Sequence, residues 1–156
     1  IRAAGARIRL IQDGDVHAAI ATCKEDTGID VLFGIGGAPE GVLAAAARLC
    51  MGGEIQGQLQ FQNDSQRERS QKLMGEGDVG RVLSLQDMAR GEVLFAATGV
   101  TSGDLLKGVR FFAGGCATHS LVMRSKSGTV RYIEAEHDFV RKPGYTSEGE
   151  PPVVSR

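Results

Sequence analysis

The sequence lacks tryptophan and has few other aromatic residues, with six phenylalanines and two tyrosines among 156 residues. A core without large rings has to be built from valine, leucine, isoleucine and alanine. The hydrophobic fraction of 42% supplies enough of these residues for an ordinary globular protein. A chain of this length can bury a core of its own, so we expect one main domain.

An excess of one charge sign is also missing, because 18 basic and 19 acidic residues leave a formal net charge of -1. This balance argues against nucleic acid or an anionic membrane surface as the main partner. No apolar run approaches the roughly 18 residues that span a bilayer. The opening IRAAGARIRL also lacks the pattern of a secretory signal, so we expect a cytoplasmic protein.

Cysteine is scarce, and Cys23, Cys50 and Cys116 form an odd set without metal-ligand spacing. Buried, reduced thiols in a cytoplasmic protein are the simplest interpretation. The chain also lacks an initiator methionine, because its first residue is Ile1. The opening residues already have the pattern of the middle of a helix. We therefore expect the sequence to begin inside a longer protein, with part of any active site outside it.

Strand and helix patterns alternate in the first half of the sequence. Continuous or alternating apolar runs predict strands at 7–11, 29–35 and 54–61. Helical patterns and their caps lie between and after these runs, at 16–26, 39–51 and 63–74. Strands alternating with helices predict the α/β class.

Strand patterns dominate the second half. Strands are predicted at 92–100, 109–112, 120–124 and 129–136. Ser84 opens a capping box for a short helix, and TSGDLLKG is read as a turn with room for one helical turn. The four residues SKSG join the last two strands as a hairpin, so antiparallel pairing and a mixed sheet are expected. We expect residues 1–141 to form the domain and residues 142–156, rich in Pro, Gly, Ser and Glu, to be a disordered tail.

Two predicted strands end in loops that suit a ligand site. Asp13-Gly14-Asp15 follows the first strand, and GIGGAPEG, residues 34–41, follows the second. Ligands of open α/β sheets bind outside the carboxyl ends of the strands. Carboxylates there can hold Mg²⁺ or Mn²⁺, while the glycines and the following helix N-terminus suit a phosphate group. We therefore expect Asp13, Asp15 and Glu40 along one rim.

Structural explanations stay open for each of these residues. Asp15 can act as a helix N-cap, and Asp13-Gly14 is a common turn. Glu40 lies in a first helical turn, where any acid complements the helix dipole. The glycine run matches neither a P-loop, because no Lys-Ser or Lys-Thr follows, nor the GxGxxG pattern.

Other polar residues give weaker signals. His17, His119 and His137 are far apart and share no ligand pattern, so solvated or hydrogen-bonding roles are expected. Residues 98–101, TGVT, lie at the end of a predicted strand. They either reach the same rim or form a simple turn.

Four blocks of sequence, DGDV, GIGGAPEGVLAAAA, ATGVTSGDLLKGVRFF and SLVMRSKSGTVR, resemble the C-terminal half of class II fructose-1,6-bisphosphatases. That family includes the cyanobacterial enzymes that also hydrolyse sedoheptulose 1,7-bisphosphate. The blocks occur in family order, and the resemblance runs from about Ile1 to Phe139. It implies the layered α-β-α-β-α architecture of the lithium-sensitive, metal-dependent phosphatases, with this chain as the C-terminal half.

The resemblance also implies roles for five residues. The glutamate of GGAPEG binds a catalytic divalent metal ion in the family, which corresponds to Glu40 with Mg²⁺ or Mn²⁺. The glycine three residues earlier, Gly37, contacts the sugar bisphosphate. The turn Asp13, Gly14 and Asp15 contacts the substrate as well.

The implied activity is hydrolysis of the 1-phosphate of fructose 1,6-bisphosphate to fructose 6-phosphate, in gluconeogenesis or the Calvin cycle, by a homo-oligomer. The alternatives are a sedoheptulose bisphosphatase, an inositol phosphatase, or a non-catalytic sugar-phosphate-binding or assembly fragment. The family's other metal-binding acids, including those of its Asp-Pro-Leu-Glu-Gly-Thr motif, and a Lys-Pro-Arg segment lie in an N-terminal half that this chain does not contain. No catalytic residue is therefore assigned in this half, and the N-terminal half is the expected partner.

Overall fold

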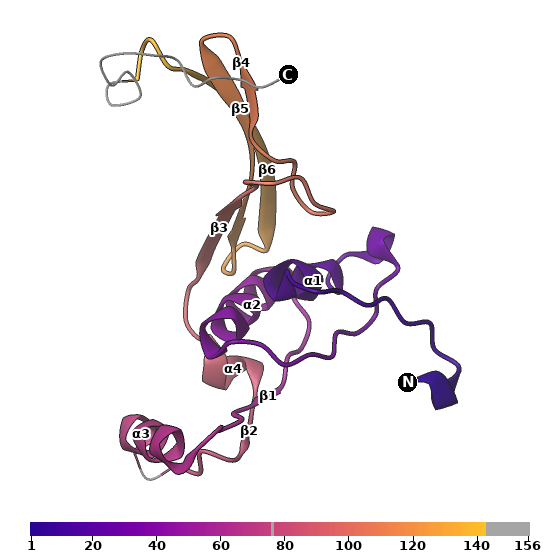
Figure 1. Ribbon diagram of the computed structural model, residues 1–156, viewed down its shortest axis with the longest axis vertical. Coiled ribbons are helices and arrows are strands. Elements are labelled where there is room, and N and C mark those ends of the chain that lie inside the picture. The colour runs from indigo at the N-terminus through magenta and orange to yellow at the C-terminus, as the bar shows by residue number, and fades with distance from the viewer. Residues whose placement is uncertain (76, 143–156) are drawn as a thin grey trace.

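The structure is a computed structural model that describes residues 1–75 and 77–142. Its helices are α1 (Asp15–Ala21), α2 (Ala38–Met51), α3 (Asp64–Met74) and α4 (Leu85–Met88), with 3₁₀ turns at Arg2–Ala4 and Glu25–Thr27. Its strands are β1 (Gly57–Gln58), β2 (Val82–Leu83), β3 (Leu94–Thr98), β4 (Arg110–Phe112), β5 (Gly115–Arg124) and β6 (Thr129–Asp138). Figure 1 shows the larger sheet at one end and α3 at the other, with α1 and α2 between them.

Strand β5 is the centre of the larger sheet. Strand β6 pairs with its whole length, while β3 and β4 pair with successive parts of its other edge. The hairpin between β5 and β6 is confirmed, with residues 125–128 as its connection. In this register Leu121 lies opposite Ala97 on β3 and Tyr132 on β6. Among the residues described, every strand pair is antiparallel.

The core lies between this sheet and helices α1 and α2. Leu121 and Met123, both fully buried, belong to one cluster with Ile20 of α1 and Ala47 of α2. Alanines on α2 let both the sheet and α1 approach closely, since a methyl group needs little space. Cys50 is also buried here, and desolvation raises the pKa of its thiol.

Helix α3 and the β1–β2 ribbon extend away from this core. Helix α3 has no buried residue, and the Asn63 side chain caps it by accepting a hydrogen bond from the Gln66 backbone N–H at 2.9 Å. Its predicted start and polar character are thus confirmed. Within the described part of the chain, no helix is long and apolar enough to cross a membrane.

Two predicted strands are wrong. Residues 7–11 and 29–35 belong to neither sheet, and most of their apolar side chains are exposed; Leu10 is 87% and Ile35 90% exposed. A strand exists only through its hydrogen-bonded neighbours, and no other described segment pairs with these two. The predicted strand at 54–61 is paired only at Gly57–Gln58.

Two helix predictions also need correction. The helix predicted at 16–26 ends at Ala21, where the Thr22 hydroxyl donates to the Ala19 carbonyl at 2.8 Å and competes with the helical backbone pattern. The helical turn considered within residues 101–108 is a series of bends instead. Helix α2 agrees with the predicted 39–51 to within one residue, so Pro39 is its second residue.

The α/β class is consistent with these helices and sheets. The parallel component of the expected mixed sheet does not occur among residues 1–75 and 77–142, because the two segments predicted to supply it are unpaired. The predicted disordered tail falls, from residue 143 onward, outside the described residues.

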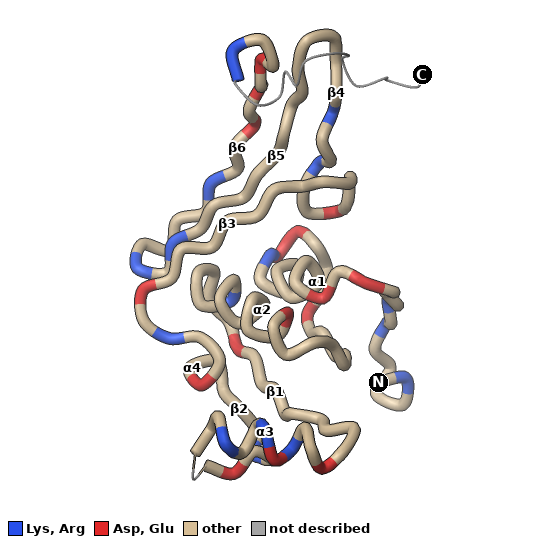
Figure 2. The backbone as a smooth tube through the Cα atoms, turned by 60° about the vertical axis from the view of Figure 1, so that its left-hand side comes forward, with Lys and Arg blue, Asp and Glu red and all other residues tan. Residues whose placement is uncertain are grey.

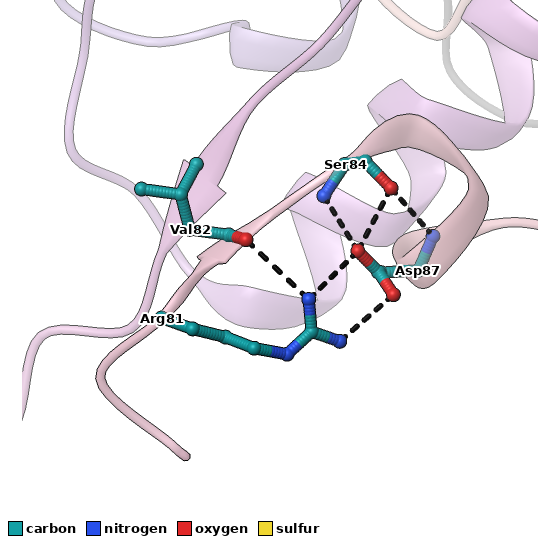
Figure 3. Close-up of polar contacts among 4 residues, drawn as sticks. All are labelled: Arg81, Val82, Ser84 and Asp87. Atoms are coloured by element: carbon teal, nitrogen blue, oxygen red, sulfur yellow. Dashed lines mark hydrogen bonds and ion pairs between the residues drawn. The ribbon is translucent and has the colours of Figure 1, made fainter. Parts of the chain in front are cut away.

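The start of α4 is fixed by the capping box that the sequence predicted (Figure 3). The Ser84 hydroxyl accepts from the Asp87 backbone N–H at 3.3 Å, and the Asp87 carboxylate accepts from the Ser84 backbone N–H at 2.9 Å. Arg81 donates to both oxygens of the same carboxylate, at 2.9 and 2.8 Å. These contacts, the Arg81 guanidinium first, hold the pKa of Asp87 well below its usual range.

We expect the Asp87→Asn variant to have a lower melting temperature than the wild-type chain at pH 7. The folded-state pKa of Asp87 is depressed, so its contribution is present above the unfolded-state pKa of about 3.9 and is lost as the pH falls through the folded-state value. Thermal unfolding followed by circular dichroism from pH 7 to pH 2 should show the difference shrinking below about pH 4. A difference that stays constant down to pH 2 would contradict this assignment.

Candidate sugar-phosphate and metal site

The acidic turn at 13–15 leads directly into α1. Gly14 precedes the helix with φ of 82°, a conformation that glycine adopts without strain, and its carbonyl accepts from the Ala18 N–H at 2.9 Å. Gly14 is therefore the N-cap residue, and the alternative of Asp15 as N-cap is wrong. Asp15 is the first helical residue, so its carboxylate is available for other contacts while it still complements the helix dipole.

The glycine-rich loop leads in the same way into α2. Gly37 is the N-cap residue of α2, and its carbonyl accepts from the Gly41 N–H at 3.0 Å. Glu40 lies in the first helical turn, as predicted. The unpaired N–H groups of this turn favour an anion in front of the helix.

The two acidic side chains meet at neighbouring residues of this loop. The Asp15 carboxylate lies against Gly36, and the Glu40 carboxylate folds back over Gly37. Helices α1 and α2 pack directly on each other, which brings the two loops together (Figure 1). The predicted proximity of Asp15 and Glu40 to one loop is therefore observed, although helix packing produces it and a parallel sheet does not.

Glycine at both loop positions leaves the space of a side chain to the two carboxylates. A Cβ atom built on Gly36 would overlap the Asp15 carboxylate, and its carboxyl carbon would be 3.4 Å away. A Cβ atom on Gly37 would overlap the Glu40 carboxylate, with its carboxyl carbon at 3.1 Å. The loop thus presents bare backbone beside two carboxylates, all of it exposed to solvent.

These donors match one part of a divalent metal site. Carboxylate oxygens are the ligands that Mg²⁺ and Mn²⁺ prefer, usually together with phosphate oxygens and water. Among residues 1–75 and 77–142, however, no group of three or more histidine, cysteine or acidic side chains is placed to hold a metal ion. Glu40 and Asp15 are the carboxylates that lie against this loop.

A family model and curated relatives match most of this chain. Residues 1–137 match the family model described as bacterial fructose-1,6-bisphosphatase, glpX-encoded. The chain belongs to this family. It is 46% identical, over 88% of its length, to the D-fructose 1,6-bisphosphatase class 2/sedoheptulose 1,7-bisphosphatase of Synechococcus sp. (strain JA-3-3Ab). It is 47% identical, over 90% of its length, to the protein of the same name from Microcystis aeruginosa (strain NIES-843 / IAM M-2473).

The chain spans less than half the length of these bisphosphatase relatives, 43% of the first and 44% of the second. Asp13, the remaining acid of the predicted site, is exposed at the turn that precedes α1. Figure 2 shows acidic positions both near the start of α1 and on α2.

The other polar residues considered make contacts of their own, away from the Asp15 and Glu40 carboxylates. His119 accepts the Lys107 backbone N–H on Nδ1 at 3.1 Å, and His137 Nε2 is 2.9 Å from the Thr118 hydroxyl. Hydrogen-bonding roles are thus confirmed for these two histidines. The Thr98 hydroxyl pairs with that of Ser120, at 2.8 Å across the sheet, and so does not contact the loop carboxylates.

One residue near the site was missed by sequence reasoning. Asp104 forms an ion pair with Arg9, four residues before Asp13. The two partners are 95 positions apart, and no local pattern indicates their contact. Only the folded position of the β3–β4 loop reveals it.

We expect Gly36→Ala to displace the Asp15 carboxylate without unfolding the chain, because both residues are exposed and Asp15 can turn into solvent. Gly34→Ala is the matched control, since a Cβ atom there meets nothing within 4 Å. Carboxyl ¹³C chemical shifts should change at Asp15 in the first variant and remain unchanged in the second. Equal shifts in both variants would show that the Asp15 contact with Gly36 is absent in solution.

Proposed function

We propose that this protein is a cytoplasmic, metal-dependent enzyme that hydrolyses the 1-phosphate of fructose 1,6-bisphosphate to give fructose 6-phosphate. The proposal rests on the meeting of the Asp15 and Glu40 carboxylates at the bare Gly36-Gly37 backbone, at the N-terminus of α2. Membership of the glpX-type bisphosphatase family supports the substrate class. The exposed position of the loop leaves room for a sugar phosphate.

Different residues of the chain would bind the metal ion and the sugar phosphate. Glu40 would hold one divalent ion, Mg²⁺ or Mn²⁺, since its carboxylate offers a hard oxygen ligand. The bare backbone at Gly37 and the turn of Asp13, Gly14 and Asp15 would position the sugar phosphate, with the N–H groups of α2 facing a phosphate oxygen. When bound, the metal ion would supply Lewis-acid polarisation of the phosphoryl group and a water molecule of lowered pKa.

We propose that the remaining ligands and the general base come from polypeptide outside these 156 residues. The curated relatives are more than twice as long as the region they share with this chain, which supports a contribution from elsewhere. The exposed apolar residues of segments 7–11 and 29–35 support it as well, because such residues are normally covered. Pairing of these segments with further strands would complete the layered α-β-α-β-α fold, in a homo-oligomeric enzyme.

In the protein with its full natural chain, Glu40→Gln should lower metal-dependent phosphate release from fructose 1,6-bisphosphate by at least about a hundredfold. The amide keeps the size of the side chain but removes the anionic metal ligand. Glu54→Gln is a control in which an exposed glutamate beyond the end of α2 loses the same charge. Turnover of the Glu40 variant with saturating Mn²⁺ within a fewfold of wild type would contradict the metal-binding role.

The isolated 156-residue chain should release no phosphate above background, because no three or more of its described histidine, cysteine or acidic side chains are grouped to hold a metal ion. Mixing or co-expressing it with the N-terminal portion of a relative should restore metal-dependent turnover if the two parts assemble. Phosphate release measured with each part alone is the control. Full turnover by the isolated chain would refute the claim that the site is partial.

Sedoheptulose 1,7-bisphosphate is the second candidate substrate, since the names of the similar cyanobacterial proteins include both activities. Competition between the two bisphosphates in a phosphate-release assay separates them. An inositol phosphate in the same assay tests the wider phosphatase alternative. Sugar-phosphate binding without turnover in the full natural chain would favour a non-catalytic role.

A further inference from the structure

The loop between β3 and β4, residues 99–109, has a defined shape. The Gly99 N–H donates to the His119 carbonyl at 3.0 Å, and the Val109 N–H donates to the Val100 carbonyl at 3.1 Å, which closes the base of the loop. Leu106 anchors the loop in the main core and is 8% exposed. A Cβ atom on Gly99 would overlap the Lys107 carbonyl, so the two arms of the loop lie in close contact.

His119 of β5 fixes the second arm of this loop. Its Nδ1 atom accepts the Lys107 backbone N–H at 3.1 Å, while the Tyr132 ring of β6 stacks on the imidazole with centroids 5.8 Å apart. The Lys107 side chain also contacts Glu134 of β6 at 2.5 Å, and this contact lowers the pKa of the Glu134 carboxyl. The loop is thus held to both strands of the long hairpin.

Asp104 lies on this anchored loop and bonds to Arg9. Within the described chain, this ion pair is the one side-chain hydrogen bond made by residues 6–13, and no backbone hydrogen bond joins those residues to another element. The next residues of the chain form the Asp13–Asp15 turn. Among the described residues, that turn is thus tied to the β3–β4 loop through the Arg9–Asp104 contact and to the core through α1.

We propose that Asp104 is a positioning residue for the sugar-phosphate site. Through Arg9 it holds the segment that carries Asp13, Gly14 and Asp15, so that the turn faces the glycine loop before α2. The proposal rests on the proposed function, because it treats that turn as a substrate contact. Both side chains are more than 60% exposed, so a moderate contribution is expected, as for surface ion pairs in general.

The test is a charge exchange in the protein with its full natural chain. Arg9→Glu and Asp104→Arg each bring like charges together and should raise the KM for fructose 1,6-bisphosphate by about three- to tenfold, with kcat within about twofold of wild type. The double variant restores an attractive pair of reversed polarity. Its KM should return to within about twofold of the wild-type value.

Matched controls separate positioning from a general effect of charge. Glu92 and Lys126 form another exposed ion pair, 2.7 Å apart beside the β5–β6 hairpin, and Glu92→Arg should leave KM unchanged. Circular dichroism checks that each variant is folded, and Asp104→Asn replaces Asp104→Arg if the reversed charge prevents folding. Single variants with wild-type KM, or a double variant whose defect is the sum of the single defects, would overturn the proposal.

Failure of the proposed function has a different signature. If the wild-type protein releases no phosphate from any sugar bisphosphate, that function falls while the ion pair can still be tested by hydrogen exchange. Backbone amides of residues 10–16 should then exchange at least about twofold faster in each single variant than in the double variant. Equal exchange in all variants would overturn the positioning role as well.

Discussion

The packing of α1 against α2 is the contact on which the candidate site depends. Helix α1 has only seven residues, and Ile20 fixes it in the same core cluster as Ala47 of α2. Small side chains on α2 let the two helices approach closely, and their N-terminal loops then lie side by side. A shift of α1 along α2 would move the Asp15 carboxylate away from Gly36, although neither residue is part of the core.

This arrangement places two acidic side chains beside one loop in front of a helix N-terminus. The proposed divalent cation would be held there by Glu40 together with a phosphate group. The glycines matter as well, because any side chain at Gly36 or Gly37 would occupy the volume that the carboxylates now fill. The shape of the loop and the proposed chemistry thus involve the same groups, the Gly36-Gly37 backbone and the two carboxylates.

Features governed by local sequence could be predicted. Helix α2 follows from its proline and alanines, α4 from the Ser84 capping box, and the long hairpin from its turn. The segments 7–11 and 29–35 could not be assigned correctly, because an apolar run becomes a strand only when another strand pairs with it. Their apolar composition is still informative, because exposed apolar side chains are typical of surfaces that contact further polypeptide.

The approach of two acidic side chains to one loop was predicted, but for a different physical reason. Asp15 and Glu40 were expected at one edge of a parallel sheet, whereas two packed helices bring them to the same loop. The family resemblance, confirmed over residues 1–137, supplied the expectation of a metal and a sugar phosphate. The Arg9–Asp104 contact had no such signal, because it joins segments that are distant in sequence and meet only in the folded chain.

The most direct test of the central claim is a crystal structure of the protein with its full natural chain, grown with Mn²⁺ and fructose 1,6-bisphosphate and measured at the manganese absorption edge. The account predicts an anomalous peak within coordination distance of a Glu40 carboxylate oxygen, about 2.0–2.3 Å. The sugar phosphate should contact the Gly37 backbone and the Asp13–Asp15 turn. Manganese bound only elsewhere, with Glu40 free in solvent beside a bound substrate, would contradict it.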